Sequence, residues 1–200
     1  MFVKVCGLDS VANARVALES GADAVGVVMS PRSPRHLEFA AAAEIVAAVG
    51  QRAETVLVVR EMDAAEAATT AERLGADVLQ LHGRRYARED FARALAVFPR
   101  LWRATSLTED PDLEVGAWGE ERLLLDAPQA GSGERWDLSA LTARRPGGEW
   151  LLAGGLTPDN VADAIVIARP WGVDVSSGVE SGPGVKDPEL IRAFVAAARG

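Results

Sequence analysis

Short apolar segments alternate along the chain with longer segments in which alanine, valine and leucine recur at helical spacing. A short apolar run bounded by glycine or polar residues is typical of a buried strand, and apolar residues every three or four positions predict an amphipathic helix. The pattern predicts eight strands, at residues 2–7, 24–28, 55–59, 77–81, 101–105, 122–125, 150–153 and 173–175. It predicts helices at residues 9–20, 39–49, 63–74, 89–98, 138–144, 158–168 and 188–199, with a short or broken helix over 108–119 and a glycine-containing loop over 127–137.

This regular alternation of strand and helix favours parallel βαβ units. A Gly-Ala-Asp pattern, in which a helix ends and a strand begins, occurs at residues 21–23 and again at 75–77. Eight such units predict an α/β fold, a compact single-domain (β/α)8 TIM barrel over residues 1–200. The alternative is a doubly wound open sheet, but its usual five or six strands would leave two or three units unexplained.

Composition excludes several classes of protein. Hydrophobic residues make up 48% of the chain and charged residues 25%, which is typical of a folded core and not of disorder. The net charge of −8 argues against a nucleic-acid partner. No apolar run approaches about 18 residues and no signal-peptide pattern is present, so we expect no membrane partner and a cytoplasmic location. The single cysteine excludes an internal disulfide.

The barrel prediction directs attention to the residues that follow each strand, because TIM-barrel active sites lie at the carboxyl ends of the strands. These residues are Cys6, Arg32, Arg35, Arg60, His82, Thr105, Asp126, Gly154, Gly155, Ser176, Ser177 and Gly178. Each type also has an ordinary structural role. A lone cysteine is usually a small buried hydrophobe, an aspartate can cap a helix, and loop arginines are often simply solvated. Their convergence on one end of one barrel favours a functional site.

Two glycine-containing loops follow the last two predicted strands, at residues 153–158 and 176–180. Loops at these positions of a barrel commonly bind phosphate through backbone N–H groups, and glycine lets the backbone approach an anion closely. We expect a phosphate-binding site formed by Gly154, Gly155, Ser176, Ser177 and Gly178. Tight turns without a ligand are the alternative.

Several motifs, in order and nearly end to end, resemble the phosphoribosylanthranilate isomerase family. They are Lys4-Val5-Cys6-Gly7, Ser33-Pro34-Arg35, Leu79-Gln80-Leu81-His82-Gly83, Leu124-Leu125-Asp126, Gly131-Ser132-Gly133, the segment 154–161 and the segment 173–180. The resemblance implies an isomerase of tryptophan biosynthesis that binds a small-molecule phosphosugar and uses neither cofactor nor metal. It implies an Amadori rearrangement, in which an N-phosphoribosyl aromatic amine becomes a 1-amino-1-deoxyribulose phosphate.

The resemblance also assigns roles to individual residues. The general base of the family falls on Cys6, and the general acid falls on Asp126. The arginine that binds the anthranilate carboxylate matches Arg35, although the repeated Ser-Pro-Arg leaves Arg32 as a rival. We expect His82 and Asp174 to contribute to substrate binding. Lys4 shares a strand face with Cys6, so we expect its ammonium group to stabilise the thiolate.

The sequence departs from the family pattern in three places. Ala130 stands where the first of two glycines is usual, and Trp136-Asp137-Leu138 stands where Phe-Asp-Trp is common. Arg60-Glu61 follows the third strand, where the family normally has asparagine. These departures concern the loop after strand six and the shape of the anthranilate pocket, and they leave the acid–base pair unchanged.

Other functions stay open at this point. A metal-dependent epimerase would need about two histidines and two aspartates at strand ends, and the chain has only His36 and His82. An indole-forming synthase barrel gives no reason for the cysteine. An isomerase acting on a related phosphoribosyl amine and a non-catalytic phosphosugar-binding barrel are the remaining alternatives. No apolar surface element is obvious, which favours a monomer over a dimer.

Overall fold

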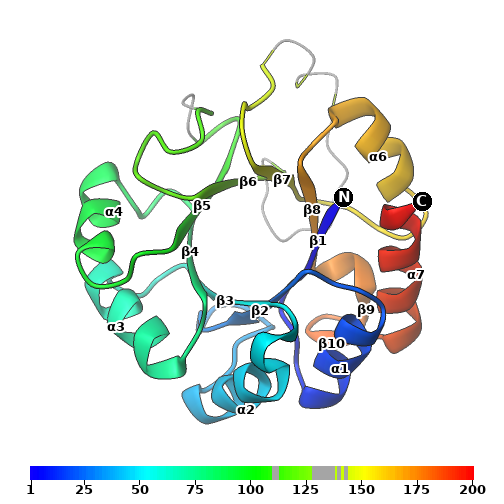
Figure 1. Ribbon diagram of the computed structural model, residues 1–200, viewed down its shortest axis with the longest axis horizontal. Coiled ribbons are helices and arrows are strands. Elements are labelled where there is room, and N and C mark those ends of the chain that lie inside the picture. Colours follow the sequence, from blue (N-terminus) through cyan, green and yellow to red (C-terminus); the bar gives the residue numbers. More distant parts are fainter. Residues whose placement is uncertain (110–112, 128–137, 139–140, 142–143) are drawn as a thin grey trace.

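The computed structural model describes residues 1–109, 113–127, 138, 141 and 144–200. Eight parallel strands close into a barrel in sequence order, with β8 paired to β1 (Figure 1). The strands are β1 (Phe2–Val5), β2 (Ala24–Val28), β3 (Glu54–Val59), β4 (Val78–His82), β5 (Leu101–Ser106), β6 (Arg122–Asp126), β7 (Trp150–Leu152) and β8 (Gly172–Val175). The predicted (β/α)8 barrel is confirmed.

Helices surround the barrel and cover its outer face (Figure 1). They are α1 (Val11–Glu19), α2 (Phe39–Val49), α3 (Ala64–Leu74), α4 (Arg88–Leu95), α6 (Val161–Ala168) and α7 (Pro188–Arg199), with 3-10 turns at Gly50–Arg52 and Ser177–Val179. A short antiparallel hairpin, β9 (Glu180–Gly182) and β10 (Val185–Lys186), follows β8. The sequence pattern did not predict this hairpin. No helix among the described residues is long and apolar enough to cross a membrane.

Three predicted helices differ from the structure. The helix expected at residues 89–98 ends at Leu95. The helix expected at residues 158–168 begins only at Val161, because the Asn160 side chain accepts a hydrogen bond from Thr157 N and donates one to Gly155 O, each 2.8 Å long. These bonds hold the preceding residues as a turn. The described residues between 108 and 119 form turns and no helix, and Gly116 and Gly119 both have φ of 88° there. Most of the expected loop 127–137 and helix 138–144 lies outside the described residues, as does Gly131-Ser132-Gly133.

Strand side chains alternate between the inside of the barrel and the helix-covered outside. Inside, Cys6, Val28, Val58 and Trp102 belong to one small apolar cluster. Outside, a much larger cluster joins the other faces of the strands to the helices. The interior is therefore a packed core, although it also holds the buried polar side chains of Lys4 and Gln80.

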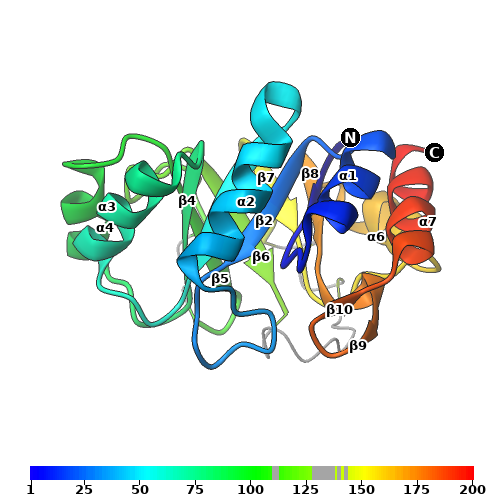
Figure 2. The same cartoon turned by 90° about the horizontal axis from the view of Figure 1, so that it is seen from below.

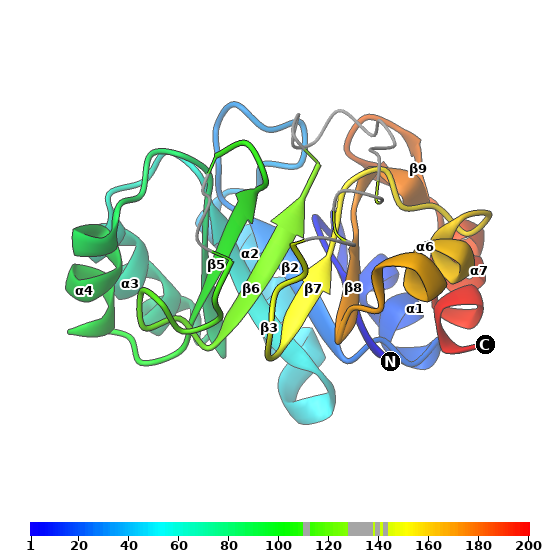
Figure 3. The ribbon, with the colours of Figure 1, turned by 90° about the horizontal axis from the view of Figure 1, so that it is seen from above.

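Aromatic and charged side chains close the amino-terminal end of the barrel. The Arg122 guanidinium lies over the rings of Phe2, Trp102 and Trp171, at 4.8, 5.0 and 4.6 Å from their centroids. It also pairs with Glu54 at 2.6 Å and with Glu149 at 2.8 Å. At the opposite end, towards which the strand arrows point in Figure 3, lie the loop after β2 and the hairpin strand β9. Figure 2 shows the same two segments together at one end, away from both termini.

Candidate active site

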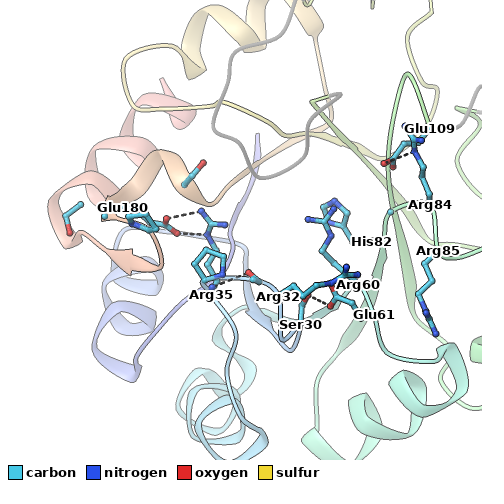
Figure 4. A pocket seen from close by; sticks show the side chains of 17 residues that line it. Ser30, Arg32, Arg35, Arg60, Glu61, His82, Arg84, Arg85, Glu109 and Glu180 are labelled. Carbon is cyan, nitrogen blue, oxygen red and sulfur yellow. Dashed lines mark hydrogen bonds and ion pairs between the residues drawn. The ribbon is translucent and has the colours of Figure 1, made fainter.

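A cavity of about 900 Å³ opens at the carboxyl ends of the strands (Figure 4). The loops after β2, β3 and β4 line it, together with the segment that runs from Ser177 to Pro183. A second cavity of about 50 Å³ shares Ser177 with it and is lined by Asp126, Gly154, Gly155, Asp174 and Ser176 among others. Most of the predicted site residues therefore meet at one end of the barrel, as the fold requires.

Cys6, Lys4 and Asp174 form a buried group, and Asp174 also lines the small cavity. Lys4 lies opposite Asp174 in the β1–β8 ladder, and its Nζ donates a hydrogen bond to Asp174 Oδ1 at 2.7 Å. Burial disfavours the charge of Lys4, but the attraction of Asp174 and Cys6 outweighs it, so the Lys4 pKa is raised. Burial also raises the pKa of the Cys6 thiol, and the Lys4 charge opposes this effect without cancelling it. A raised pKa favours the protonated thiol at neutral pH.

A glycine makes room for the thiol. Gly26 in β2 faces β1, and a Cβ at this position would lie 2.8 Å from Cys6 Sγ and 3.2 Å from Cys6 Cα. Both distances are far below ordinary van der Waals separation. Gly26 therefore leaves room for the sulfur, and the sequence analysis did not single out this position.

Asp126 and His82 face each other at the ends of β6 and β4. Burial raises the pKa of Asp126 to about 6, although a hydrogen bond of 2.8 Å from its neighbour Ala127 N favours the ionised form. Burial, with the charges of Arg60 and Lys4, lowers the pKa of His82 to about 3, so the ring is neutral. His82 Nε2 lies 3.6 Å from Asp126 Oδ2, too far for a direct hydrogen bond. Asp126 thus keeps a protonated fraction near neutral pH, as a general acid must.

Arg35 lies in the large cavity, and its guanidinium already has an anionic partner. Its Nε and Nη2 donate to Glu180 Oε1 and Oε2 at 2.6 and 2.9 Å. Lys186 Nζ donates to the same carboxylate at 2.6 Å and to Ser176 O at 2.9 Å. Burial of Glu180 opposes its charge, but these bonds outweigh burial and lower its pKa. The rival, Arg32, has a side chain that is 84% exposed and pairs with Glu61 at 3.3 Å.

The two predicted phosphate loops pack backbone against backbone. A Cβ at Gly178 would lie 1.8 Å from Leu156 O, and a Cβ at Gly154 would lie 2.4 Å from Ala127 N. Gly154 and Gly155 also have positive φ, 86° and 64°. Ser177 begins a 3-10 turn directly after Ser176, and both residues line the small cavity. Only glycine permits this close approach of the loop backbones.

Sequence reasoning missed Glu180 and Lys186 as partners of the site. The hairpin β9–β10 brings Lys186 back to contact Ser176. Neither the alternation of a strand nor the spacing of a helix predicts this contact. Among the described residues, no group of three or more histidine, cysteine, aspartate or glutamate side chains is arranged to hold a metal ion.

Comparison with known proteins places the whole chain in one group of relatives. The family model described as N-(5'phosphoribosyl)anthranilate (PRA) isomerase matches residues 3–197. A protein of that name from Rhodopseudomonas palustris (strain BisA53) is 44% identical over 98% of this chain and 95% of its own length. The crystal structure of TrpF from Jonesia denitrificans has a TM-score of 0.93 and 59% identity, and covers 100% of this chain and 97% of its own. A phosphoribosyl anthranilate isomerase in complex with reduced 1-(o-carboxyphenylamino)-1-deoxyribulose 5-phosphate has a TM-score of 0.87 and 30% identity, covering 100% and 99%.

Proposed function

Because the chain belongs to the N-(5'-phosphoribosyl)anthranilate isomerase family, we propose that it converts N-(5-phosphoribosyl)anthranilate into 1-(o-carboxyphenylamino)-1-deoxyribulose 5-phosphate, in tryptophan biosynthesis. The observation that carries the proposal beyond family membership is the position of Asp126. This partly protonated carboxyl lines the same small cavity as Gly154, Gly155, Ser176 and Ser177. A phosphate bound by those loops brings the attached sugar to the acid.

The first chemical step opens the ribose ring. Asp126 donates its proton to the ring oxygen, the bond between that oxygen and C1′ breaks, and the nitrogen lone pair forms a C1′=N Schiff base. A carboxyl with a pKa of about 6 can hold this proton at the pH at which the enzyme works. His82 lies beside Asp126 and is neutral. It therefore does not form an ion pair with the Asp126 carboxylate that remains after the proton transfer.

The second step removes the proton from C2′. The Cys6 thiolate takes it, the C–H electron pair forms a C1′=C2′ double bond, and the C=N pair returns to nitrogen. The resulting enol gains a proton at C1′, its C2′ hydroxyl loses its proton to water, and C2′ becomes the ketone of the product. Because burial raises the thiol pKa, the thiolate is a minor form, and the Lys4 ammonium lowers the free energy of reaching it. Asp174 holds that ammonium in place.

The phosphate and carboxylate ends of the substrate occupy different parts of the site. We assign the phosphate to Gly154, Gly155, Ser176, Ser177 and Gly178 around the small cavity. The aromatic carboxylate then extends into the large cavity, where Arg35 presents Nη1 beside its Glu180 pair. An arginine can donate one or two N–H hydrogen bonds to the carboxylate of the substrate.

We further propose that residues 1–200 act as one domain, as a monomer in the cytoplasm. Among the described residues the exposed large apolar side chains are Met1, Val97, Val166, Ile167 and Val185, of which only Val166 and Ile167, on α6, are adjacent in sequence; the most exposed is Val166 at 73%. One relative, from Thermotoga maritima, is named as dimeric. Light scattering at assay concentration tests the proposal, and a mass twice that of the chain contradicts it.

The test of the reaction is turnover of freshly generated phosphoribosylanthranilate, followed by loss of its fluorescence. The proposal predicts consumption of the substrate by the wild type and an NMR spectrum of the product with a ketone at C2′. Folded protein that consumes no substrate, or that yields no ketose, contradicts the proposal.

A further inference from the structure

The chain has two lysines among its 21 lysine and arginine residues, and both are buried. Lys4 is 0% exposed and Lys186 is 4% exposed. An ammonium group is compact and carries three donors, whereas the guanidinium of arginine is larger and planar. In a chain that otherwise uses arginine, lysine at these two positions is consistent with a need for a compact buried cation.

Lys186 joins three segments around the phosphate loop that follows β8. Its Nζ donates to Ser176 O at 2.9 Å and to Glu180 Oε1 at 2.6 Å, and it lies 3.4 Å from Ser176 Oγ. Its backbone N donates to Asp9 Oδ2 at 2.9 Å, in the loop after β1. One residue therefore fixes the loop after β8 relative to the loop after β1.

The general base is tied to the same loop. Cys6 N donates to Val175 O at 2.8 Å, one residue before the carbonyl that Lys186 binds. A Cβ at Gly7 would lie 3.0 Å from Ser176 Oγ, so the Ser176 side chain packs over the residue that follows the thiol. Movement of the Ser176 loop would therefore disturb the segment that carries the thiol.

Lys186 and Arg35 share one carboxylate. Arg35 Nε and Nη2 donate to Glu180 as Lys186 does, so these three side chains together carry one positive charge in excess. Figure 4 shows the Arg35–Glu180 pair at the edge of the large cavity. By contrast, Lys4 is paired one-to-one with Asp174. The excess charge lies beside the loop to which phosphate is assigned.

This charge acts on the thiol. Burial raises the pKa of Cys6, the charge of Lys4 lowers it, Asp174 raises it, and the charge of Lys186 adds a smaller lowering effect. The other charged or titratable groups at this end of the barrel come from the loops after β1 and β2, from β9 and from the ends of β3, β4 and β6; they are Asp9, Arg35, Glu180, Arg60, His82 and Asp126.

We propose that Lys186 is a positioning residue for the general base: it holds the phosphate loop against the segment that carries Cys6, and its charge favours the thiolate. This proposal rests on the proposed function. Lys186 is not among the described residues that line the two cavities, so it acts through Ser176 and Cys6 and not by touching the substrate. Phosphate binding and proton removal then depend on the same ammonium group.

The test compares two substitutions of Lys186 with the wild type. Lys186→Met removes both the charge and the donors, whereas Lys186→Gln removes the charge and keeps an N–H donor for Ser176 O and Glu180. The matched control is Arg192→Met, which removes an exposed cation of α7 that pairs with one carboxylate, Glu189. Ultraviolet titration follows the single thiol, steady-state kinetics give kcat and KM against pH, and circular dichroism confirms folding.

We expect both Lys186 variants to raise the Cys6 pKa, because both remove a nearby cation. Below the thiol pKa, kcat should fall by the factor that the measured pKa shift predicts, because it follows the fraction of thiolate. Lys186→Met should also raise KM roughly tenfold or more through loss of the bonds that hold the loop, and Lys186→Gln should raise it less. Arg192→Met should leave the thiol pKa unchanged and both constants within about twofold of the wild type.

An unchanged Cys6 pKa in the Lys186 variants would overturn the proposal, as would equal KM values in Lys186→Met and the wild type. Lys186→Gln decides the role of the charge if Lys186→Met does not fold. The proposed function fails separately: wild type that does not turn over phosphoribosylanthranilate contradicts that function, whereas the thiol titration needs no substrate and still tests the effect of Lys186 on the base.

Discussion

Lys4 and Asp174 form a buried ion pair whose two atoms, Nζ and Oδ1, are 2.7 Å apart, with the lysine side chain fully inaccessible to water. The pair follows from the register of β1 against β8, which places the two residues opposite each other. Both charges act on the Cys6 thiol, and they act in opposite directions: Lys4 lowers its pKa and Asp174 raises it. The pair therefore sets how readily the thiolate forms.

Changing either member of this pair should move the thiol pKa in a predictable direction. Lys4→Met removes the stabilising cation and should raise the Cys6 pKa, whereas Asp174→Asn removes an anion and should lower it. Since Cys6 is the only cysteine, ultraviolet titration of the thiolate reports it alone. Shifts of the same sign in the two variants would contradict this electrostatic account.

Lys4→Met should also destabilise the protein by about 3 kcal/mol or more, because it leaves Asp174 charged and unpaired in the barrel. The double variant Lys4→Met/Asp174→Asn removes both charges and is the control. It should recover much of the lost free energy of unfolding in urea titrations. Equal destabilisation in the single and double variants would show that packing around Lys4, and not the unpaired charge, is responsible.

Asp126→Asn should stabilise the protein relative to the wild type in a pH-dependent manner. The folded-state pKa of about 6 exceeds the unfolded value of 3.8, so wild-type stability is full below about pH 4 and falls as the pH rises to about 6. Roughly two units correspond to about 3 kcal/mol. The variant escapes this loss, so its advantage in urea unfolding should grow between about pH 4 and pH 7. If the difference in free energy of unfolding between Asp126→Asn and the wild type does not change with pH, the pKa of Asp126 is not raised.

Gly178→Ala should weaken phosphate binding, because its Cβ would fall 1.8 Å from Leu156 O, a backbone atom that cannot yield without moving the other phosphate loop. We expect KM to rise roughly tenfold or more, which corresponds to about 1.4 kcal/mol. Gly147→Ala is the matched control, since a Cβ there meets nothing within 4 Å and no positive φ is involved. Steady-state kinetics distinguish them, and an unchanged KM in Gly178→Ala would remove the loop from the phosphate site.

Gly26→Ala should act on the chemical step. The added Cβ would lie 2.8 Å from Cys6 Sγ and would displace the sulfur from its place inside the barrel. We expect kcat to fall by about tenfold to a hundredfold with a much smaller change in KM, because misplacing a catalytic group by about 1 Å costs rate more than binding. Equal effects on kcat and KM would indicate a general loss of structure.

Much of the fold could be predicted because the chain repeats one local pattern. The apolar runs around β2, β3 and β4 predicted strands whose ends agree with the structure to within about one residue. The helix start at Val161 could not be predicted, because it depends on side-chain hydrogen bonds of Asn160 to the loop before it. The hairpin β9–β10 was missed because its strands are only three and two residues long.

For the site, sequence could identify residue types at strand ends but not their partners. Cys6 and Asp126 were predicted because they lie at the ends of strands, and the structure places Cys6 in the interior cluster of the barrel and Asp126 on the wall of the small cavity. That Glu180 takes the fork of Arg35, or that Gly26 makes room for the thiol, depends on contacts between distant segments.

The most direct measurement is the turnover of phosphoribosylanthranilate by the wild type and by Cys6→Ser, compared at saturating substrate. If Cys6 is the general base, the wild type turns over and the variant loses roughly a thousandfold or more in kcat, within the range of general base catalysis, with little change in KM. A Cys6→Ser enzyme that keeps its activity to within about tenfold would contradict the account and move the base to another residue.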